Sequence, residues 1–182
     1  MSSSLNNSVD ISGSVLEKKG PQAIAPAVVA QIKILLGREP RGLEAIEVVD
    51  YQGAPSVIRV ASLVDDKPFP TMYWLVDKHL NYRIDQLEAG GLIARMQQMI
   101  DADESLQSAM IYDHQQFILQ RESHMSKVIK QRLIDQDYFD PLQSRGIGGI
   151  ANFTRIRCLH TYYASHLVNP NTIGSWLDKE YL

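Results

Sequence analysis

Glycines and arginines near the C-terminal end of the sequence predict a site for a bound anion. Segment 141–177 has no acidic residue and contains the candidate anion-binding residues Arg145, Gly146, Gly148, Gly149, Arg155 and Arg157. We expect a helix to begin just after Thr154, which would place Arg155 and Arg157 in its first turn, where cations oppose the helix dipole. A phosphate or carboxylate bound there would offset this unfavourable charge. The alternative is that the glycines form a turn and the arginines pair with acids elsewhere, since the run lacks the Lys-Ser/Thr of a P-loop.

A second pair of arginines, Arg38 and Arg41, flanks Pro40 between the first expected helix and the first expected strand. Two guanidinium groups beside a rigid proline could grip a carboxylate or phosphate. The alternative is that they cap the last carbonyls of the helix. If the two groups of arginines converge, Arg38 and Arg41 would close over an anion that the C-terminal group holds.

Two polar residues interrupt an otherwise apolar helical stripe near the middle of the sequence. Steps of three and four residues place on one face Leu106, Met110, His114, Phe117, Arg121, Met125 and Val128. A buried His or Arg must be paired or must line a cavity, because burying it unpaired is costly. We expect His114 and Arg121 to meet Glu88, the carbonyls of segment 68–70 or the last helix near His160. We interpret them as lining a ligand pocket, with a purely structural pairing as the alternative.

The candidate catalytic residues are Cys158 and His160, together with His114. On a regular helix Cys158 and His160 would point about 200° apart, too far to bind one metal ion or to form a nucleophile–base pair. His160 and His166 fail in the same way. We therefore expect no metal site and no cofactor. The helix start and the nearby arginines would favour a thiolate at Cys158, whereas a buried structural thiol is the alternative.

The composition is that of a globular protein, with 45% hydrophobic and 21% charged residues among 182. We expect a polar tail over residues 1–25 and a single domain over 26–182. The net charge of −3 disfavours a general nucleic-acid coat protein, although not a local basic patch. One cysteine excludes an intramolecular disulfide. The start lacks the pattern of a secretion signal, and no apolar run approaches the length of a membrane span, so a cytoplasmic protein is expected.

The candidate residues must be positioned by a small sheet and a series of helices. The sequence predicts a helix over 26–36 and three strands over 43–49, 56–63 and 71–76, which would form an antiparallel meander. Two prolines should keep segment 65–70 out of any sheet. Helical periodicity then begins at Leu80 and breaks at Gly90-Gly91. A further helix is expected to begin at Asp101 and to end near Ser123 or Leu133. A final helix is expected over 155–168. Strands followed by helices indicate the α+β class.

Several short strings, in order along the chain, carry a resemblance to a known family. They are 36–42, 68–71, 87–89 before Gly91-Leu92, His114 with Arg121, 146–150, 157–160, and Asn169-Pro170 before Gly174. In order and spacing they resemble the bacterial family called domain of unknown function 501, over roughly residues 31 to 175.

The family's motif near the end of the chain differs in this sequence. Family members read Lys-Cys-Leu-His followed by further histidines, whereas here Arg157 replaces the lysine, and Tyr162 and Ser165 stand where others often carry histidine. The difference argues against a metal site built from a histidine cluster. Because the family has no assigned activity, the resemblance supports the positions of the candidate site residues and implies no chemistry.

Two classes of function remain open from the sequence. The first is binding of a phosphate- or carboxylate-bearing small ligand, with group transfer or hydrolysis by a histidine acid–base if the protein is an enzyme. The second is a non-enzymatic interaction module in which helices with exposed Met and aromatic side chains pair in a homodimer. Nucleic-acid binding through the same arginines is a minor alternative, limited by the acidic net charge.

Overall fold

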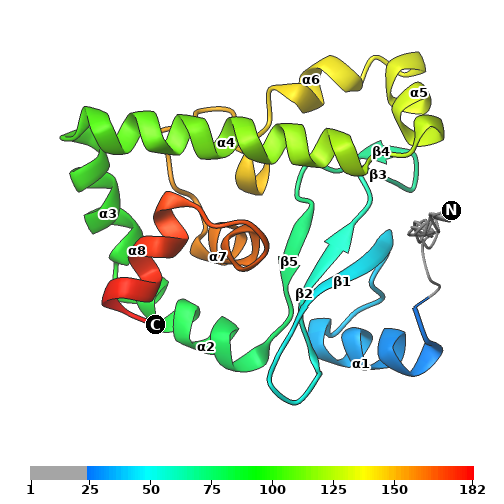
Figure 1. Cartoon of the computed structure of the whole chain (residues 1–182), viewed down its shortest axis with the longest axis horizontal. Coiled ribbons are helices and arrows are strands. Elements are labelled where there is room, and N and C mark those ends of the chain that lie inside the picture. Colours follow the sequence, from blue (N-terminus) through cyan, green and yellow to red (C-terminus); the bar gives the residue numbers. More distant parts are fainter. Residues whose placement is uncertain (1–23) are drawn as a thin grey trace, which may run out of the picture.

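The computed structural model describes residues 24–182, so nearly all of the tail expected over 1–25 lies outside the described residues. Figure 1 shows a small sheet with helix α1 (Pro26–Leu36) on one side and the C-terminal helices on the other. Proline starts α1 and Gly37, at a φ of 68°, ends it in the left-handed conformation, as the sequence predicts.

The sheet is the expected antiparallel meander of β1 (Leu43–Val49), β2 (Pro55–Val60) and β5 (Tyr73–Leu75), in the order β1-β2-β5. Between β2 and β5 the chain forms a second, two-stranded ribbon of β3 (Leu63–Val64) and β4 (Lys67–Pro68). The prediction that prolines exclude segment 65–70 from a sheet is wrong at Pro68, which pairs with Leu63. Proline is tolerated there because the ribbon is short and all edge. Asp65 and Asp66, both at positive φ, make the reversal.

Each face of the three-stranded sheet packs against a different group of helices. Ile58 and Val60 pack with Ile32 of α1. On the opposite face, Val57, Tyr73 and Leu75 join the main core, to which α7 (Leu159–Val168) contributes Leu159, Tyr162 and Tyr163. Residues that alternate along β2 therefore belong to two separate cores.

The remaining helices are α2 (Lys78–Ala89), α3 (Leu92–Asp101), α4 (Glu104–His124), α5 (Lys127–Asp135), α6 (Phe139–Gln143) and α8 (Thr172–Glu180). Of these, α2 and α8 pack against α7, α4 crosses the upper part of the molecule in Figure 1, and α5 and α6 lie above the C-terminal half of α4. The carboxylate of Asp103, rather than that of Asp101, caps α4 by accepting from Ser105 and Leu106 N–H. Of the two predicted ends, the earlier one is confirmed, because α4 stops at His124. Asn171 caps α8, a helix that was not predicted from the sequence.

The predicted final helix begins four residues late, at Leu159 rather than Arg155. Thr154 is not its N-cap: the Thr154 N–H and hydroxyl both bond the side chain of Asn152. Gln97 of α3 accepts from Ile156 N–H, and the carboxylate of Glu88 accepts from Leu159 N–H. Side chains from α2 and α3 therefore hold segment 155–158 outside the helix and determine where α7 starts.

The α+β class predicted from the sequence is confirmed. Among residues 24–182, none of the helices combines the length and the apolar character needed to cross a bilayer.

Candidate functional site

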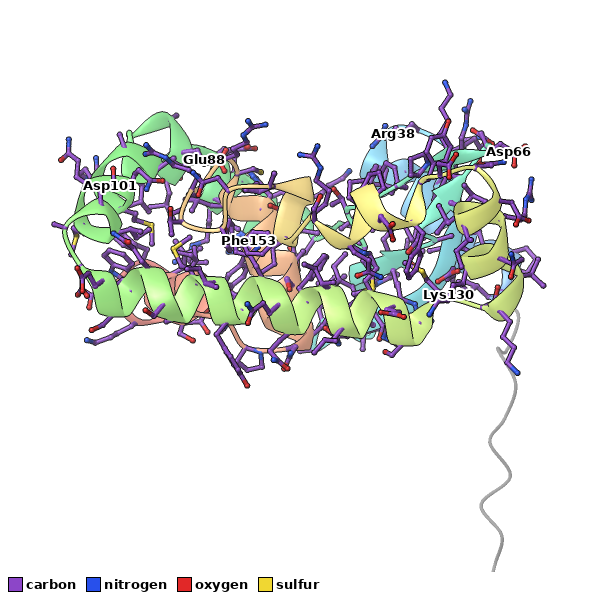
Figure 2. The ribbon with its side chains drawn as sticks, turned by 90° about the horizontal axis from the view of Figure 1, so that it is seen from above. Arg38, Asp66, Glu88, Asp101, Lys130 and Phe153 are labelled. Carbon is purple, nitrogen blue, oxygen red and sulfur yellow. The ribbon has the colours of Figure 1, made fainter. Side chains whose placement is uncertain are left out.

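His114 is fully buried in the interior and bonded to protein groups on both ring nitrogens. Its Nδ1 lies 2.9 Å from Ile147 N, which donates to it, so a neutral ring carries its proton on Nε2. Nε2 lies 2.9 Å from the Tyr162 hydroxyl, which donates in turn to the Arg155 carbonyl. The ring also stacks on Phe153, which lies behind α4 in Figure 2. Burial lowers the pKa of His114 to about 4, so the ring is neutral near pH 7.

Arg121 is also fully buried, and it bonds backbone carbonyls rather than an acid. Its Nη1 donates to the carbonyls of Pro70 and Arg145, and its Nη2 donates to that of Leu142. Burial lowers the pKa of Arg121 to about 10. Of the expected polar contacts, those with the Pro70 carbonyl and with the helix of His160, at Tyr162, are present, and both side chains join segments that are distant along the chain.

The glycine loop is packed against α4 and uses its own amides. Gly146 N–H donates to the Ile150 carbonyl, Ile147 N–H to His114, and Gly149 N–H to the Gly146 carbonyl. A Cβ at Gly146 would lie 2.2 Å from His114 Nδ1, so only glycine lets the loop approach the ring. Gly148 and Gly149 both have positive φ. The expected site of a helix start behind free glycine amides is therefore not formed, because the loop leads into segment 151–158 and not directly into α7.

The three C-terminal arginines share no common partner among residues 24–182. Arg155 Nη1 lies 3.3 Å from an Asp101 carboxylate oxygen, which matches the alternative that these arginines pair with acids elsewhere. Arg145 contributes its backbone carbonyl to Arg121. Arg157 is exposed, and within residues 24–182 it makes no ion pair. Neither Arg155 nor Arg157 lies in the first turn of a helix.

Arg38 and Arg41 lie at a groove on the α1 side of the sheet. The Arg38 guanidinium sits over the Trp74 ring, 4.4 Å from its centre, and the Trp74 indole N–H is fixed by the Thr71 carbonyl. Arg41 pairs with Asp65 at 2.9 Å. The groove has a volume of about 600 Å³. Its floor is apolar, formed by Leu36, Ile58, Val60, Val64, Phe69 and Trp74. Its rim carries Arg38, Glu39, Arg41, Asp65 and Lys67.

The two groups of arginines do not converge. In Figure 2, Arg38 and Asp66 lie at one end of the molecule, and Asp101, the partner of Arg155, lies at the other. The single anion site expected from the sequence, with Arg38 and Arg41 closing over a ligand held by the C-terminal arginines, is therefore not formed. Arg38 and Arg41 line the groove on the α1 side of the sheet without the C-terminal arginines.

Cys158 and His160 come together at the start of α7, contrary to the angular argument made from the sequence. That argument placed both on one helix, but Cys158 precedes α7 with extended backbone, at φ −153° and ψ 120°. Its Sγ lies 3.6 Å from His160 Nδ1. The carboxylate of Glu88, from the end of α2, lies 3.4 Å from the same nitrogen. Sulfur, nitrogen and oxygen therefore meet in one half-buried cluster.

The other ring nitrogen of His160 faces α2. His160 Nε2 lies 3.3 Å from the Asn81 carbonyl and 3.3 Å from Asp85 Oδ1. The hydrogen bond with Cys158 raises the pKa of His160 to about 9, helped by the charge of Glu88 and opposed by burial. The surroundings of this ring thus favour a positive charge. His160 also lines a cavity of about 320 Å³, which shares Phe69 and Trp74 with the groove of Arg38.

Sequence reasoning missed three residues of these sites. Glu88 was expected near His114 and Arg121, but it meets Leu159 and His160 instead. Asp85 precedes Glu88 by three residues on the same helix face, and that spacing was a signal for an acidic surface facing another segment. Trp74, which was not among the candidate site residues, lines both the groove and the cavity beside His160.

Comparison with known proteins gives one match. The family model described as "Protein of unknown function (DUF501)" matches residues 46–179. No curated protein and no solved structure matches the chain.

Proposed function

The chain belongs to the family described as Protein of unknown function (DUF501), and we propose that it binds a small molecule bearing a carboxylate or phosphate in the groove beside Trp74. The observation that carries the proposal is the position of Arg38, whose guanidinium lies over the Trp74 ring at the edge of an apolar cavity.

The dimensions and lining of the groove support a small ligand. Its volume of about 600 Å³ lies within the range of about 300–1,000 Å³ typical of small-molecule sites. Such sites combine an apolar lining with a few polar groups that fix the orientation of the ligand. Here the side chains of α1, β2 and β5 supply the apolar floor, and the 38–41 loop and the β3–β4 ribbon supply the polar rim.

The charges on the rim favour an anion. Within residues 24–182, Arg38 and Lys67 make no ion pair, whereas Arg41 shares its charge with Asp65. A guanidinium held over an indole by its central carbon still has N–H groups that can donate to a carboxylate or phosphate. We therefore expect the ligand to place its anionic group beside Arg38 and an apolar body against Phe69 and Trp74.

The test is a thermal-shift and calorimetry panel on the full chain with inorganic phosphate, nucleotides and aryl and acyl carboxylates. A ligand at 100 times its dissociation constant should stabilise the protein by about 2.7 kcal/mol. Arg38→Ala should weaken binding about tenfold or more, since a hydrogen bond to a charged group contributes about 1.5–3 kcal/mol. Added salt should weaken it further.

Arg157→Ala is the matched control, because Arg157 is exposed and lies outside the groove. Binding that responds to Arg157→Ala as strongly as to Arg38→Ala would contradict a site in the groove. The same conclusion would follow if no member of the panel stabilised the protein.

Pairing of two copies through α4 is a second candidate, favoured by apolar side chains on its outer face. Tyr112 is 60% exposed and Leu119 is 59% exposed. Because they are seven residues apart, they share one face of the helix. An exposed pair of this kind supports the homodimer considered from the sequence.

A further inference from the structure

The side chains of Glu88, Cys158 and His160 converge from α2 and from the start of α7. We propose that these three side chains bind a divalent transition metal ion, with Zn²⁺ as the best fit to the donor set. This site is separate from the groove of Arg38, and the proposal does not depend on ligand binding there.

Two of the three distances between the donor atoms match the edges of a tetrahedron around zinc, and the third, from Cys158 Sγ to the Glu88 carboxylate, is within 4.8 Å. With Zn–S near 2.3 Å and Zn–N and Zn–O near 2.0–2.1 Å, tetrahedral geometry requires about 3.5 Å between sulfur and nitrogen and about 3.4 Å between nitrogen and oxygen. The structure has 3.6 Å from Cys158 Sγ to His160 Nδ1 and 3.4 Å from His160 Nδ1 to Glu88 Oε1. His160 Nδ1 is therefore already placed for an ion that it would share with Cys158 and Glu88, and binding would require the sulfur and the carboxylate oxygen to approach each other to about 3.5 Å.

The hydrogen bonds around His160 point the nitrogen that a metal would use toward the other two donors, so an ion would displace the proton that Nδ1 shares with Cys158. Nε2 faces the Asn81 carbonyl and the Asp85 carboxylate, both of which only accept, so a neutral ring carries its proton there. The lone pair is then on Nδ1, which faces Cys158 and Glu88. A carboxylate behind a histidine is the usual outer partner in metal sites, where it orients the ring and raises its basicity.

The second protein ligand is oriented by the backbone of α7. Glu88 Oε1 accepts from Leu159 N–H at 2.5 Å, which fixes the carboxylate beside Cys158 and His160. Metal-bound carboxylates are commonly held by hydrogen bonds in this way. The extended backbone of Cys158 directs its Sγ back toward the same point.

The charges of the donor set suit a divalent ion. A thiolate, a carboxylate and a neutral imidazole together neutralise a charge of two, and the amino-terminal end of α7 stabilises both anions. Sulfur with nitrogen and oxygen selects zinc-like ions over Mg²⁺ or Ca²⁺, which prefer oxygen alone. Three protein ligands leave a fourth position open, as in zinc sites that bind water or substrate. His160 would then act as a ligand rather than as an acid or base.

The test is the metal content of the full chain, purified without chelators, followed by titration of the metal-free protein with Co²⁺. We expect about one zinc per chain, and a thiolate-to-cobalt charge-transfer band when Co²⁺ binds. Cys158→Ser should remove that band, and Glu88→Gln, which keeps an acceptor for Leu159 N–H, should weaken binding at least about tenfold. Asp85→Asn should weaken it about 10–100-fold.

His79→Gln is the matched control, because His79 is an exposed histidine on the same helix as Glu88. It should leave the zinc content and the cobalt spectrum unchanged. The proposal is overturned if the wild-type chain binds Co²⁺ without a charge-transfer band, or binds neither ion. The side chains of Cys158, His160 and Glu88 would then be held together by a shared proton rather than by a metal ion.

Discussion

For His114 and Arg121, the sequence predicts that the side chains are buried and hydrogen-bonded, but it does not identify their partners. Both interrupt an apolar stripe, and both are buried and bonded to other segments, as the cost of burying unpaired polar groups requires. Their partners lie 21 to 51 residues away, and the sequence alone does not say which segments fold against α4. Both side chains bond groups from other parts of the fold, and a further role in binding a ligand stays a prediction.

His114 should make the protein less stable in acid. Its pKa is about 4 in the folded protein and about 6.5 when unfolded, so the unfolded chain binds more protons between these values. The stabilisation is complete above about pH 6.5 and is lost as the pH falls toward 4, up to about 3 kcal/mol. Urea unfolding at several pH values measures this slope.

His114→Gln provides the comparison, because an amide can accept from Ile147 N–H and donate to Tyr162 without titrating. It should cost about 1–3 kcal/mol at neutral pH and remove the acid-dependent loss of up to about 3 kcal/mol that the ring contributes. His79→Gln, on the surface, should change neither quantity. An acid slope that is identical in wild type and His114→Gln would refute this role of the ring.

At the scale of the elements, local signals located the strands and most helix ends, and tertiary contacts overrode them at one place. Gly37 ends α1 and Gly90-Gly91 separates α2 from α3, as predicted, because those signals act within one turn of the chain. Thr154 was a plausible helix start, but Gln97 and Glu88 bond Ile156 and Leu159 N–H from other helices. The meeting of Cys158 with His160 follows from that override, so sequence reasoning could not find it.

The glycine loop gives a prediction at this scale. Gly146→Ala should destabilise the protein by more than about 2 kcal/mol, because the new Cβ would overlap the His114 ring and break the contact between the loop and α4. Gly37→Ala is the control: its φ is positive but nothing lies within 4 Å of the new Cβ, so it should cost about 1 kcal/mol. Thermal or urea denaturation compares the two.

A loop used for anion binding rather than packing would behave differently. Gly146→Ala would then reduce ligand binding while leaving the free energy of unfolding within about 0.5 kcal/mol of wild type. That result would restore the anion site expected from the sequence.

At the scale of the whole molecule, the class and the sheet order could be predicted, but the distribution of charge in space could not. The sequence places two groups of arginines about a hundred residues apart, and only the three-dimensional arrangement shows that Arg38 lies at the opposite end of the molecule from Asp101, the partner of Arg155. Separation of the groups leaves a groove on the α1 side and a cluster of metal-ligating side chains at the start of α7.

The oligomeric state is the prediction at this scale. We expect light scattering at tens of micromolar to give the mass of a dimer, and Leu119→Lys, on the exposed face of α4, to give that of a monomer. Val128→Lys on α5 is the control, since Val128 is also exposed but lies on another helix. A monomeric mass for the wild-type chain would exclude pairing through this face.

The guanidinium of Arg121 has a consequence for how the protein opens. One side chain on α4 holds the carbonyl of Pro70, which precedes β5, together with those of Leu142 and Arg145, which flank the end of α6. If any of these three carbonyls moves away, the buried guanidinium of Arg121 loses a hydrogen-bond acceptor that water does not replace. The remaining hydrogen bonds then stabilise the buried charge less well. The three segments should therefore be protected as a single cooperative unit, although 75 residues separate the first from the last along the chain.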